Sequence, residues 1–241
     1  MKRLLSAIKT DFTVQVRNNL YVIGIMVALL VAGVLSYVAT PERMFLLVPA
    51  LLLTVIGGST MMYVAGMILF EKDEHTINAI IVSPLRSAEY LWAKVISLTV
   101  LATIESVIMV GGAMLIMSYW YHLSLPNIPL LLLGIVAIGI IYTLIGIIAV
   151  VRYNKITDFL VPMTGVMIVL QLPFLYFIGM VHHNIFLLIP TSAPAMIMQG
   201  AYTSLSTWHW VYAIGYTLLT ICLLAVWARH AFNAYIVCKG R

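Results

Sequence analysis

The amino-acid sequence predicts an all-α membrane protein with six transmembrane helices. Of its 241 residues, 63% are hydrophobic and only 9% are charged, and the mean hydropathy is +1.08. These values lie far outside the range of soluble domains. Because roughly 20 apolar residues in a helix cross a bilayer core of about 30 Å, the number of long apolar segments gives the number of spans.

Short polar or proline-containing breaks separate six such segments. Pro41 lies between the first two, Pro126 lies between the third and fourth, and the polar patch 152–158 ends the fourth. All six segments belong to a single transmembrane domain, residues 1–241. We predict the spans at about residues 20–38, 44–70, 95–119, 128–151, 159–181 and 209–229.

The region between the last two spans is apolar but does not have the length of a span. Residues 185–198 read IFLLIPTSAPAMIM, which is short and interrupted by prolines. We predict an outer re-entrant hairpin at residues 185–200. Protein must cover its irregular backbone, because lipid offers that backbone no hydrogen-bond partners.

The positions of Lys and Arg predict the orientation. With a cytoplasmic N-terminus, all 13 of these residues except Arg43 lie on the inner side. We therefore expect a multi-pass protein of the cell membrane whose N- and C-termini are both cytoplasmic. The net charge of +5 reflects this topology, and it does not indicate binding to nucleic acid.

Residues 2–18 fit an amphipathic interfacial helix on the inner leaflet. Apolar residues recur there at helical spacing, with the basic residues largely off their stripe. Two roles remain open for this helix, a simple anchor and a part that transmits motion. The stripe consists of Leu4, Leu5, Ile8, Phe12 and Val16.

Residues 71–94, EKDEHTINAIIVSPLRSAEYLWAK, form the longest polar stretch and lie between the second and third spans. Ile77, Ile80 and Ile81 have the spacing of one helix face. Acids crowd the N-terminal end of that helix, where the helix dipole favours anions. These residues fit a short amphipathic cytoplasmic helix, and they also fit an ordinary interfacial loop.

The dipeptide Ser83-Pro84 ends this helix, because the residue before a proline avoids the α region. The next helix begins at Pro84 or Ser87, with Ser83 or Ser87 as its N-cap. It then continues into the third span.

The sequence lacks the common motifs of nucleotide binding and hydrolysis. It contains no G-x-x-x-x-G-K-[ST] loop, no H-E-x-x-H and no G-x-S-x-G elbow. The chain therefore carries no motor of its own. We expect no metal site, because His122, His182 and His183 do not have ligand spacing. Cys222 and Cys238 do not form a disulfide framework.

Glu105 is the one acid placed well inside a span. It lies eleven residues beyond Lys94, which corresponds to roughly 16 Å along a helix. An ionisable group at this depth is costly and indicates a functional site by default. The alternative is a structural glutamate that is hydrogen-bonded to a Ser, Thr or Tyr on a neighbouring helix.

The stretch 71–94 resembles the cytoplasmic segment between the second and third spans of ABC-2-type transporter permeases, in particular the small fluoroquinolone-exporter permeases. The resemblance extends over the chain, through RYNKITDF at 152–159, the hairpin LIPTSAPAMIM and the tail RHAFNAYIV. One departure is His75, where many members have Gly before the Thr. No single residue of the segment is specific to the family.

This resemblance implies a permease subunit of an ATP-binding-cassette exporter. In the family two permease protomers pair, as a homodimer or a heterodimer, and each docks a separate ATPase subunit on the coupling helix between spans two and three. ATP and magnesium then bind to that partner, and this chain needs no cofactor. By resemblance, the ATPase-docking residues are Glu71, Glu74, Thr76, Ile77, Ile80 and Ile81.

The resemblance also places a substrate path between the second and fifth spans of the two protomers. Methionine adapts to varied apolar shapes, aromatic rings stack and Gln171 offers a polar anchor, although such residues also serve as ordinary packing. Pro162 and Pro173 fit either hinges or tolerated kinks. The candidate path residues are Met61, Met62, Tyr63, Glu105, Met163, Met167, Gln171 and Phe174, and the candidate outer gate is Pro190, Thr191 and Pro194.

The expected function is export of an amphipathic or hydrophobic substrate, such as a drug, a peptide or a lipid-like molecule. A bacteriocin or peptide exporter and a haem exporter are the alternatives within the family. Alternatives from another class are an intramembrane enzyme that uses Glu105 and a membrane scaffold. An enzyme needs a second polar group at the depth of Glu105, and the sequence shows no convincing partner there.

Overall fold

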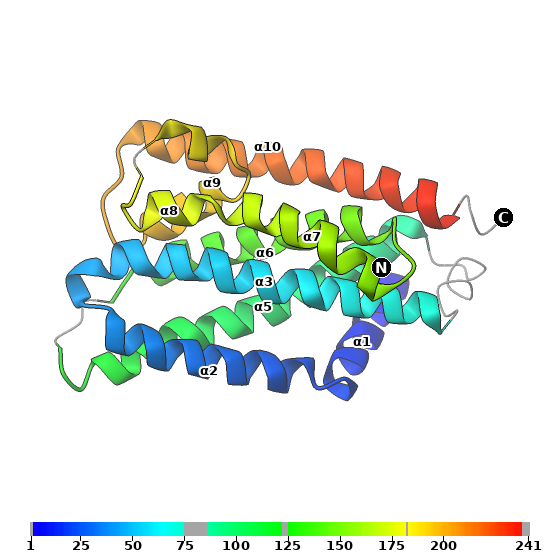
Figure 1. Ribbon diagram of the computed structural model, residues 1–241, viewed down its shortest axis with the longest axis horizontal. Coiled ribbons are helices and arrows are strands. Elements are labelled where there is room, and N and C mark those ends of the chain that lie inside the picture. Colours follow the sequence, from blue (N-terminus) through cyan, green and yellow to red (C-terminus); the bar gives the residue numbers. More distant parts are fainter. Residues whose placement is uncertain (1, 75–85, 122–124, 182, 238–241) are drawn as a thin grey trace.

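The computed structural model describes residues 2–74, 86–121, 125–181 and 183–237, and these residues form a bundle of long helices (Figure 1). Six helical segments are long and apolar enough to cross a membrane. The predicted fold class, an all-α membrane protein, is confirmed. The spanning helices are α2 (Leu20–Val38), α3 (Met44–Asp73), α5 (Ser87–Met117), α6 (Ile128–Val150), α7 (Ile156–Gln171) continued by α8 (Pro173–Phe177), and α10 (Thr207–Phe232).

Shorter helices lie at the two ends of the bundle. Helix α1 (Lys2–Arg17) runs obliquely to the long axis at the end where α10 also finishes (Figure 1), which we call the α1 end. Asn19, with a left-handed φ of 55°, makes the turn from α1 into α2. The remaining short elements are η1 (Pro41–Arg43), η2 (Asn184–Leu188), α9 (Ser192–Gln199) and η3 (Asn233–Val237).

Helix α6 lies at the centre of the bundle. It is 72% buried over its apolar window, against 22% for the span made by α7 and α8, and it packs against α3, α5, α9 and α10. The contact with α3 depends on Gly57, where a Cβ atom would lie 2.5 Å from the Tyr142 ring. The Tyr142 hydroxyl donates to the Leu53 carbonyl at 3.1 Å. A small residue thus allows close helix packing, as is common in membranes.

Helix α5 begins at Ser87 and uses a different cap from the predicted one. The backbone N–H of Arg86, the N-cap residue, donates to the Glu89 carboxylate at 2.9 Å. An acid in the first turn also suits the positive end of the helix dipole. Ser83, the other predicted cap, lies outside the described residues.

The fifth span differs from the single helix expected at residues 159–181. Helix α7 ends at Gln171, α8 begins at Pro173 and the helical segment ends at Phe177. Proline has no N–H to continue the hydrogen-bond ladder, so the break falls where Pro173 stands. Pro162 lies within α7 without ending it.

Candidate functional site

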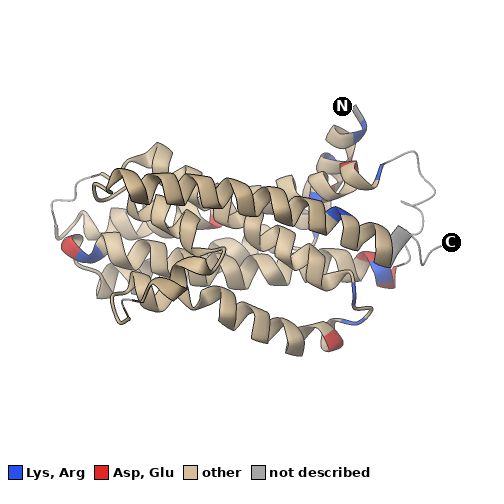
Figure 2. Cartoon of the chain, turned by 90° about the horizontal axis from the view of Figure 1, so that it is seen from above, with Lys and Arg blue, Asp and Glu red and all other residues tan. Residues whose placement is uncertain are grey.

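Most charged residues lie toward the two ends of the bundle (Figure 2), and an ionic cluster lies at the α1 end. We define the ionic cluster as Asp11 of α1, Glu71 of α3, and Tyr90 and Lys94 of α5. Lys94 Nζ lies 2.6 Å from Asp11 Oδ1 and 2.5 Å from Glu71 Oε1. The Tyr90 hydroxyl donates to Glu71 Oε2 at 2.6 Å. These contacts join three helices through one buried ammonium group.

Lys94 is shared by two carboxylates of the ionic cluster. Its side chain is 1% exposed, and its ammonium group pairs with both Asp11 and Glu71. Burial raises the pKa of Asp11, and the Lys94 ammonium opposes this rise. Removing one partner of a buried pair leaves an uncompensated charge, so each member depends on the others.

The ionic cluster flanks the predicted coupling segment. Glu71 stands in the last turn of α3, before the segment, and Lys94 stands in the second turn of α5, after it. Both carboxylate oxygens of Glu71 have partners inside the chain. Glu74, at the end of α3, is exposed. The other predicted docking residues, Thr76, Ile77, Ile80 and Ile81, lie outside the described residues.

Helix α1 directs polar side chains into the bundle, which the sequence interpretation missed. Asp11 is 6% exposed and Gln15 is fully buried. The Tyr21 hydroxyl donates to Gln15 at 3.0 Å. The signal for this face was present in the sequence, because Asp11 and Gln15 stand four residues apart and share one side of a helix.

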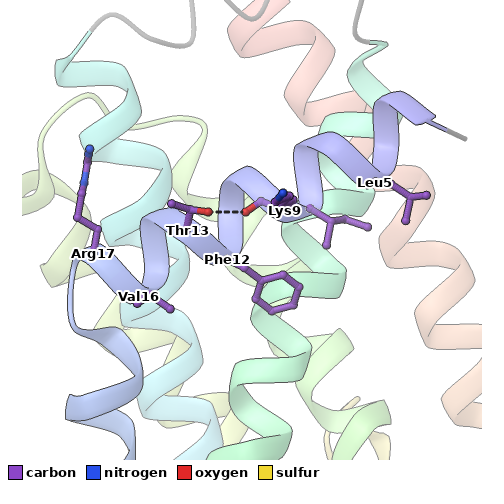
Figure 3. A pocket seen from close by; sticks show the side chains of 7 residues that line it. Leu5, Lys9, Phe12, Thr13, Val16 and Arg17 are labelled. Carbon is purple, nitrogen blue, oxygen red and sulfur yellow. Dashed lines mark hydrogen bonds between the residues drawn. The ribbon is translucent and has the colours of Figure 1, made fainter.

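The predicted apolar stripe of α1 is only partly covered by the bundle. Leu5 and Val16 are 61% and 62% exposed. Figure 3 shows Leu5, Phe12 and Val16 projecting from one side of α1, along a shallow groove, while Arg17 projects the opposite way. Apolar side chains beside a basic residue suit the boundary between lipid tails and headgroups.

Helices α3 and α7 form an antiparallel seam that brings several predicted path residues together. Gln171 Nε2 donates to the Thr54 carbonyl at 3.2 Å. Met167 Cε lies 3.8 Å from the position of a Cβ atom on Gly58, one turn further along α3. Met163 precedes Met167 by one turn of α7, and Met62 follows Gly58 by one turn of α3. We call this set, Met62, Met163, Met167 and Gln171 with Thr54 and Gly58, the α3–α7 seam.

The remaining path candidates lie elsewhere. Met61 is fully buried and faces α6, with its sulfur 3.2 Å from a Cβ position on Gly146. Phe174 is half-buried on α8. Tyr63 and Glu105 meet on the other side of α3, where α2 and α5 pack. The predicted path residues thus form several surfaces rather than one.

Glu105 occupies a closed position between α2, α3 and α5. Its side chain is 1% exposed, and neither carboxylate oxygen has a hydrogen-bond partner among the described residues. A Cβ atom on Gly24 of α2 would lie 3.7 Å from Glu105 Oε2 and 3.1 Å from the Tyr63 hydroxyl oxygen. The three residues therefore converge on one point, and the Ser59 hydroxyl of α3 also lies near the Glu105 carboxyl group without a hydrogen bond of standard geometry.

The predicted outer gate residues pack into the end of the bundle opposite α1. Ser192 through Met198 of α9 are buried, and Pro190 is half-buried. The hydroxyl of Thr191 donates to the Leu170 carbonyl at 2.6 Å, beside the break in the fifth span. The Pro194 carbonyl lies 3.0 Å from a Cβ position on Gly134 of α6. This hairpin thus contacts both α6 and the last turn of α7.

Among the described residues, six helices are long and apolar enough to cross a membrane, and they define a multi-pass membrane protein. Comparison with known families makes the assignment specific. The Fluoroquinolones export permease protein family matches residues 2–240, and the chain belongs to this family.

Two curated relatives support the same assignment over the full chain. Both are fluoroquinolones export permease proteins of Mycobacterium tuberculosis, one from strain CDC 1551 / Oshkosh and one from strain ATCC 25618 / H37Rv. Each is 32% identical over 240 residues, which cover 98% of this chain and 98% of the relative. The predicted resemblance to small fluoroquinolone-exporter permeases is confirmed.

Proposed function

We propose that this chain is the membrane subunit of an ATP-binding-cassette exporter that moves amphipathic drugs, fluoroquinolones among them, out of the cell. The observation that carries the proposal is the match to proteins named as fluoroquinolones export permeases, over 98% of this chain and 98% of each relative. The six spans and the exposed apolar faces of α7 are compatible with a path that lies inside the membrane.

The energy source in this proposal is a separate ATPase subunit, which binds ATP and magnesium. It docks at the α1 end, which faces the cytoplasm, on Glu74 together with Thr76, Ile77, Ile80 and Ile81. The exposure of Glu74 and the acidic and isoleucine-rich composition of the following residues support this surface. Glu71 supports it indirectly, because the carboxylate of Glu71 holds Lys94 and Tyr90.

The proposed path follows the α3–α7 seam between two permease protomers. The flexible thioethers of Met62, Met163 and Met167 suit apolar drugs of varied shape, and the Gln171 amide supplies a polar anchor. The lipid-side face of α7 is largely uncovered, with Val161 79% and Ile168 59% exposed. A second protomer covers this face and completes the path, with Phe174 near its outer end.

The outer hairpin acts as the external gate in this proposal. The Thr191 hydroxyl donates to the carbonyl of Leu170, so a movement of α7 at the Pro173 break would displace the hairpin as well. Pro190 and Pro194 limit the conformations of the hairpin on either side of Thr191. Met61 supports the path through its packing on α6.

Co-purification from native membranes tests the ATPase partner. We expect a bound ATPase whose turnover depends on the permease and falls when Ile80→Asp or Glu74→Lys is introduced. Glu42→Lys is the matched control, because Glu42 is an exposed acid of η1, which joins α2 to α3 at the end of the bundle opposite α1. Permease that carries no ATPase, or turnover that is equal in all three variants, would overturn the proposal.

A further inference from the structure

Glu105 is buried and makes no hydrogen bond of standard geometry among the described residues, which points to a ligand as its partner. We propose that Glu105 is the acceptor for the ammonium group of basic amphipathic drugs, which reach it from the membrane through the contact between α2 and α3. This inference rests on the proposed export function and deepens it, because it names a positively charged amine as the feature that the permease recognises.

The first step of the argument is the missing partner of Glu105. Each carboxylate oxygen is buried and lacks a hydrogen bond of standard geometry among the described residues, and Glu105 is not a member of the ionic cluster around Lys94. A buried carboxylate without a partner is costly, and ionisable groups inside a membrane commonly mark substrate or ion pathways or counter-ions of a ligand. The cost at Glu105 therefore points to a cation that arrives from outside the chain.

The second step is the chemistry of the surrounding groups. The Tyr63 hydroxyl oxygen of α3 and Glu105 Oε2 both lie within 4 Å of one Cβ position on Gly24, and Ser59, one turn earlier on α3, offers a second hydroxyl near the carboxyl group. An aromatic face attracts an organic cation, and hydroxyl oxygens accept hydrogen bonds from an ammonium group. Carboxylate, ring and hydroxyl together match an alkylammonium group whose attached body is apolar.

The third step is access from the membrane. Helix α2 packs chiefly against α5 and touches α3 at few positions, so a route to Glu105 between α2 and α3 would require few contacts to separate. At this contact the backbone of Gly24 on α2 faces the Tyr63 hydroxyl of α3, and both lie next to Glu105. Gly24 stands in the second turn of α2, near the α1 end. A drug dissolved in the inner leaflet thus meets this contact directly.

A pair of drugs that differ in one charge tests the assignment. Ciprofloxacin has a basic piperazine nitrogen, and its N-acetyl derivative does not. Binding of each compound to the permease, purified with its ATPase partner in nanodiscs, is measured by fluorescence anisotropy. We expect the wild-type protein to bind ciprofloxacin about tenfold or more tightly than the derivative, a difference typical of a buried charge pair.

The Glu105→Gln variant removes the negative charge and keeps the size of the side chain, so it tests the charge without a large change in packing. It should lose this preference, binding ciprofloxacin about tenfold more weakly while its affinity for the N-acetyl derivative stays unchanged. Retained binding of the derivative also shows that the variant is folded. If Glu105→Gln weakened the binding of both compounds equally, or left the binding of both unchanged, the role of Glu105 would be overturned.

Gly24→Ala tests the access route, with Gly33→Ala as its matched control on the same helix. A Cβ atom on Gly24 reaches within 3.1 Å of the Tyr63 hydroxyl oxygen, whereas nothing lies within 4 Å of one on Gly33. Binding of ciprofloxacin should therefore slow in Gly24→Ala alone. Equal association rates in the two variants would overturn the route between α2 and α3.

The proposed function and this inference fail in different ways. Permease that transports both compounds equally, before and after Glu105→Gln, keeps the export function and refutes the ammonium site. Wild-type permease that binds and transports neither compound refutes the export of fluoroquinolones, and the ammonium site with it.

Discussion

Lys94 Nζ lies 2.6 Å from Asp11 Oδ1, so that the N-terminal helix α1 and the beginning of α5 share a buried ion pair. Glu71 completes the pairing from the last turn of α3. The two helix ends that flank residues 75–85 are therefore held to α1. Under the proposed function, a push on the docking segment would reach α1, α3 and α5 together, which favours a role for α1 in transmitting motion.

Replacing Lys94 should destabilise the α1 end. Lys94→Met removes the buried ammonium group that pairs with Asp11 and Glu71 and leaves the Asp11 carboxylate buried without this cation, which typically costs about 3–5 kcal/mol. The measurement is the free energy of unfolding in detergent. Lys155→Met is the control, because Lys155 is exposed and its replacement should change stability by less than about 0.5 kcal/mol. Equal stability of the two variants would contradict the buried ionic cluster.

The stability of the protein should depend on the protonation of Asp11. Burial raises its pKa above the ordinary 3.8, so the folded state holds this proton more tightly than the unfolded chain. The resulting stabilisation is complete below pH 3.8 and is lost as pH rises through the folded-state pKa. The Tm of Asp11→Asn minus the Tm of the wild type should therefore increase over that window. A difference that is constant with pH, or that decreases, would contradict the assignment.

The sequence predicted the architecture because the decisive signals are local. Each span is a long apolar run, and the bilayer thickness fixes how many residues it needs. The break at Pro173 was harder to predict from the sequence, since Pro162 lies in the same span and does not interrupt its helix. The local sequence does not distinguish these two prolines.

The site was predicted less completely than the fold. Asp11 and Lys94 looked like ordinary charges of the inner side, because their pairing joins residues 83 positions apart. Glu105 stood out, since one acid in an apolar run is a local signal. Its lack of a partner appears only when α2 and α3 are placed around it. Likewise, helix packing turns the predicted path residues toward three different neighbouring helices, α2, α6 and α7.

The packing of the outer hairpin on α6 should be sensitive to one methyl group. A Cβ atom on Gly134 would lie 2.3 Å from Met198 Cγ and 3.0 Å from the Pro194 carbonyl oxygen, so Gly134→Ala should cost about 1–3 kcal/mol. Gly165→Ala, where nothing lies within 4 Å, should be neutral or slightly stabilising because alanine favours helix. Thermal unfolding compares the two, and a higher Tm for Gly134→Ala than for Gly165→Ala would disprove the close approach.

The hydroxyl of Thr191 should hold the hairpin to the fifth span. Thr191→Val removes its hydrogen bond to the Leu170 carbonyl, which should cost about 1 kcal/mol and loosen the hairpin. Thr164→Val is the control, because Thr164 is exposed and bonds within its own helix, to Leu160. Hydrogen exchange of residues 184–199 reports the loosening. Equal exchange in both variants would show that the bond does not anchor the hairpin.

Drug uptake into inside-out membrane vesicles tests export most directly. Vesicles that contain the permease and its ATPase partner are given ciprofloxacin with or without ATP and magnesium. We predict accumulation that requires ATP, falls to background in Ile80→Asp and stays at the wild-type level in Glu42→Lys. Accumulation that is the same with and without ATP would contradict the assignment of this chain as the permease of an ATP-driven exporter.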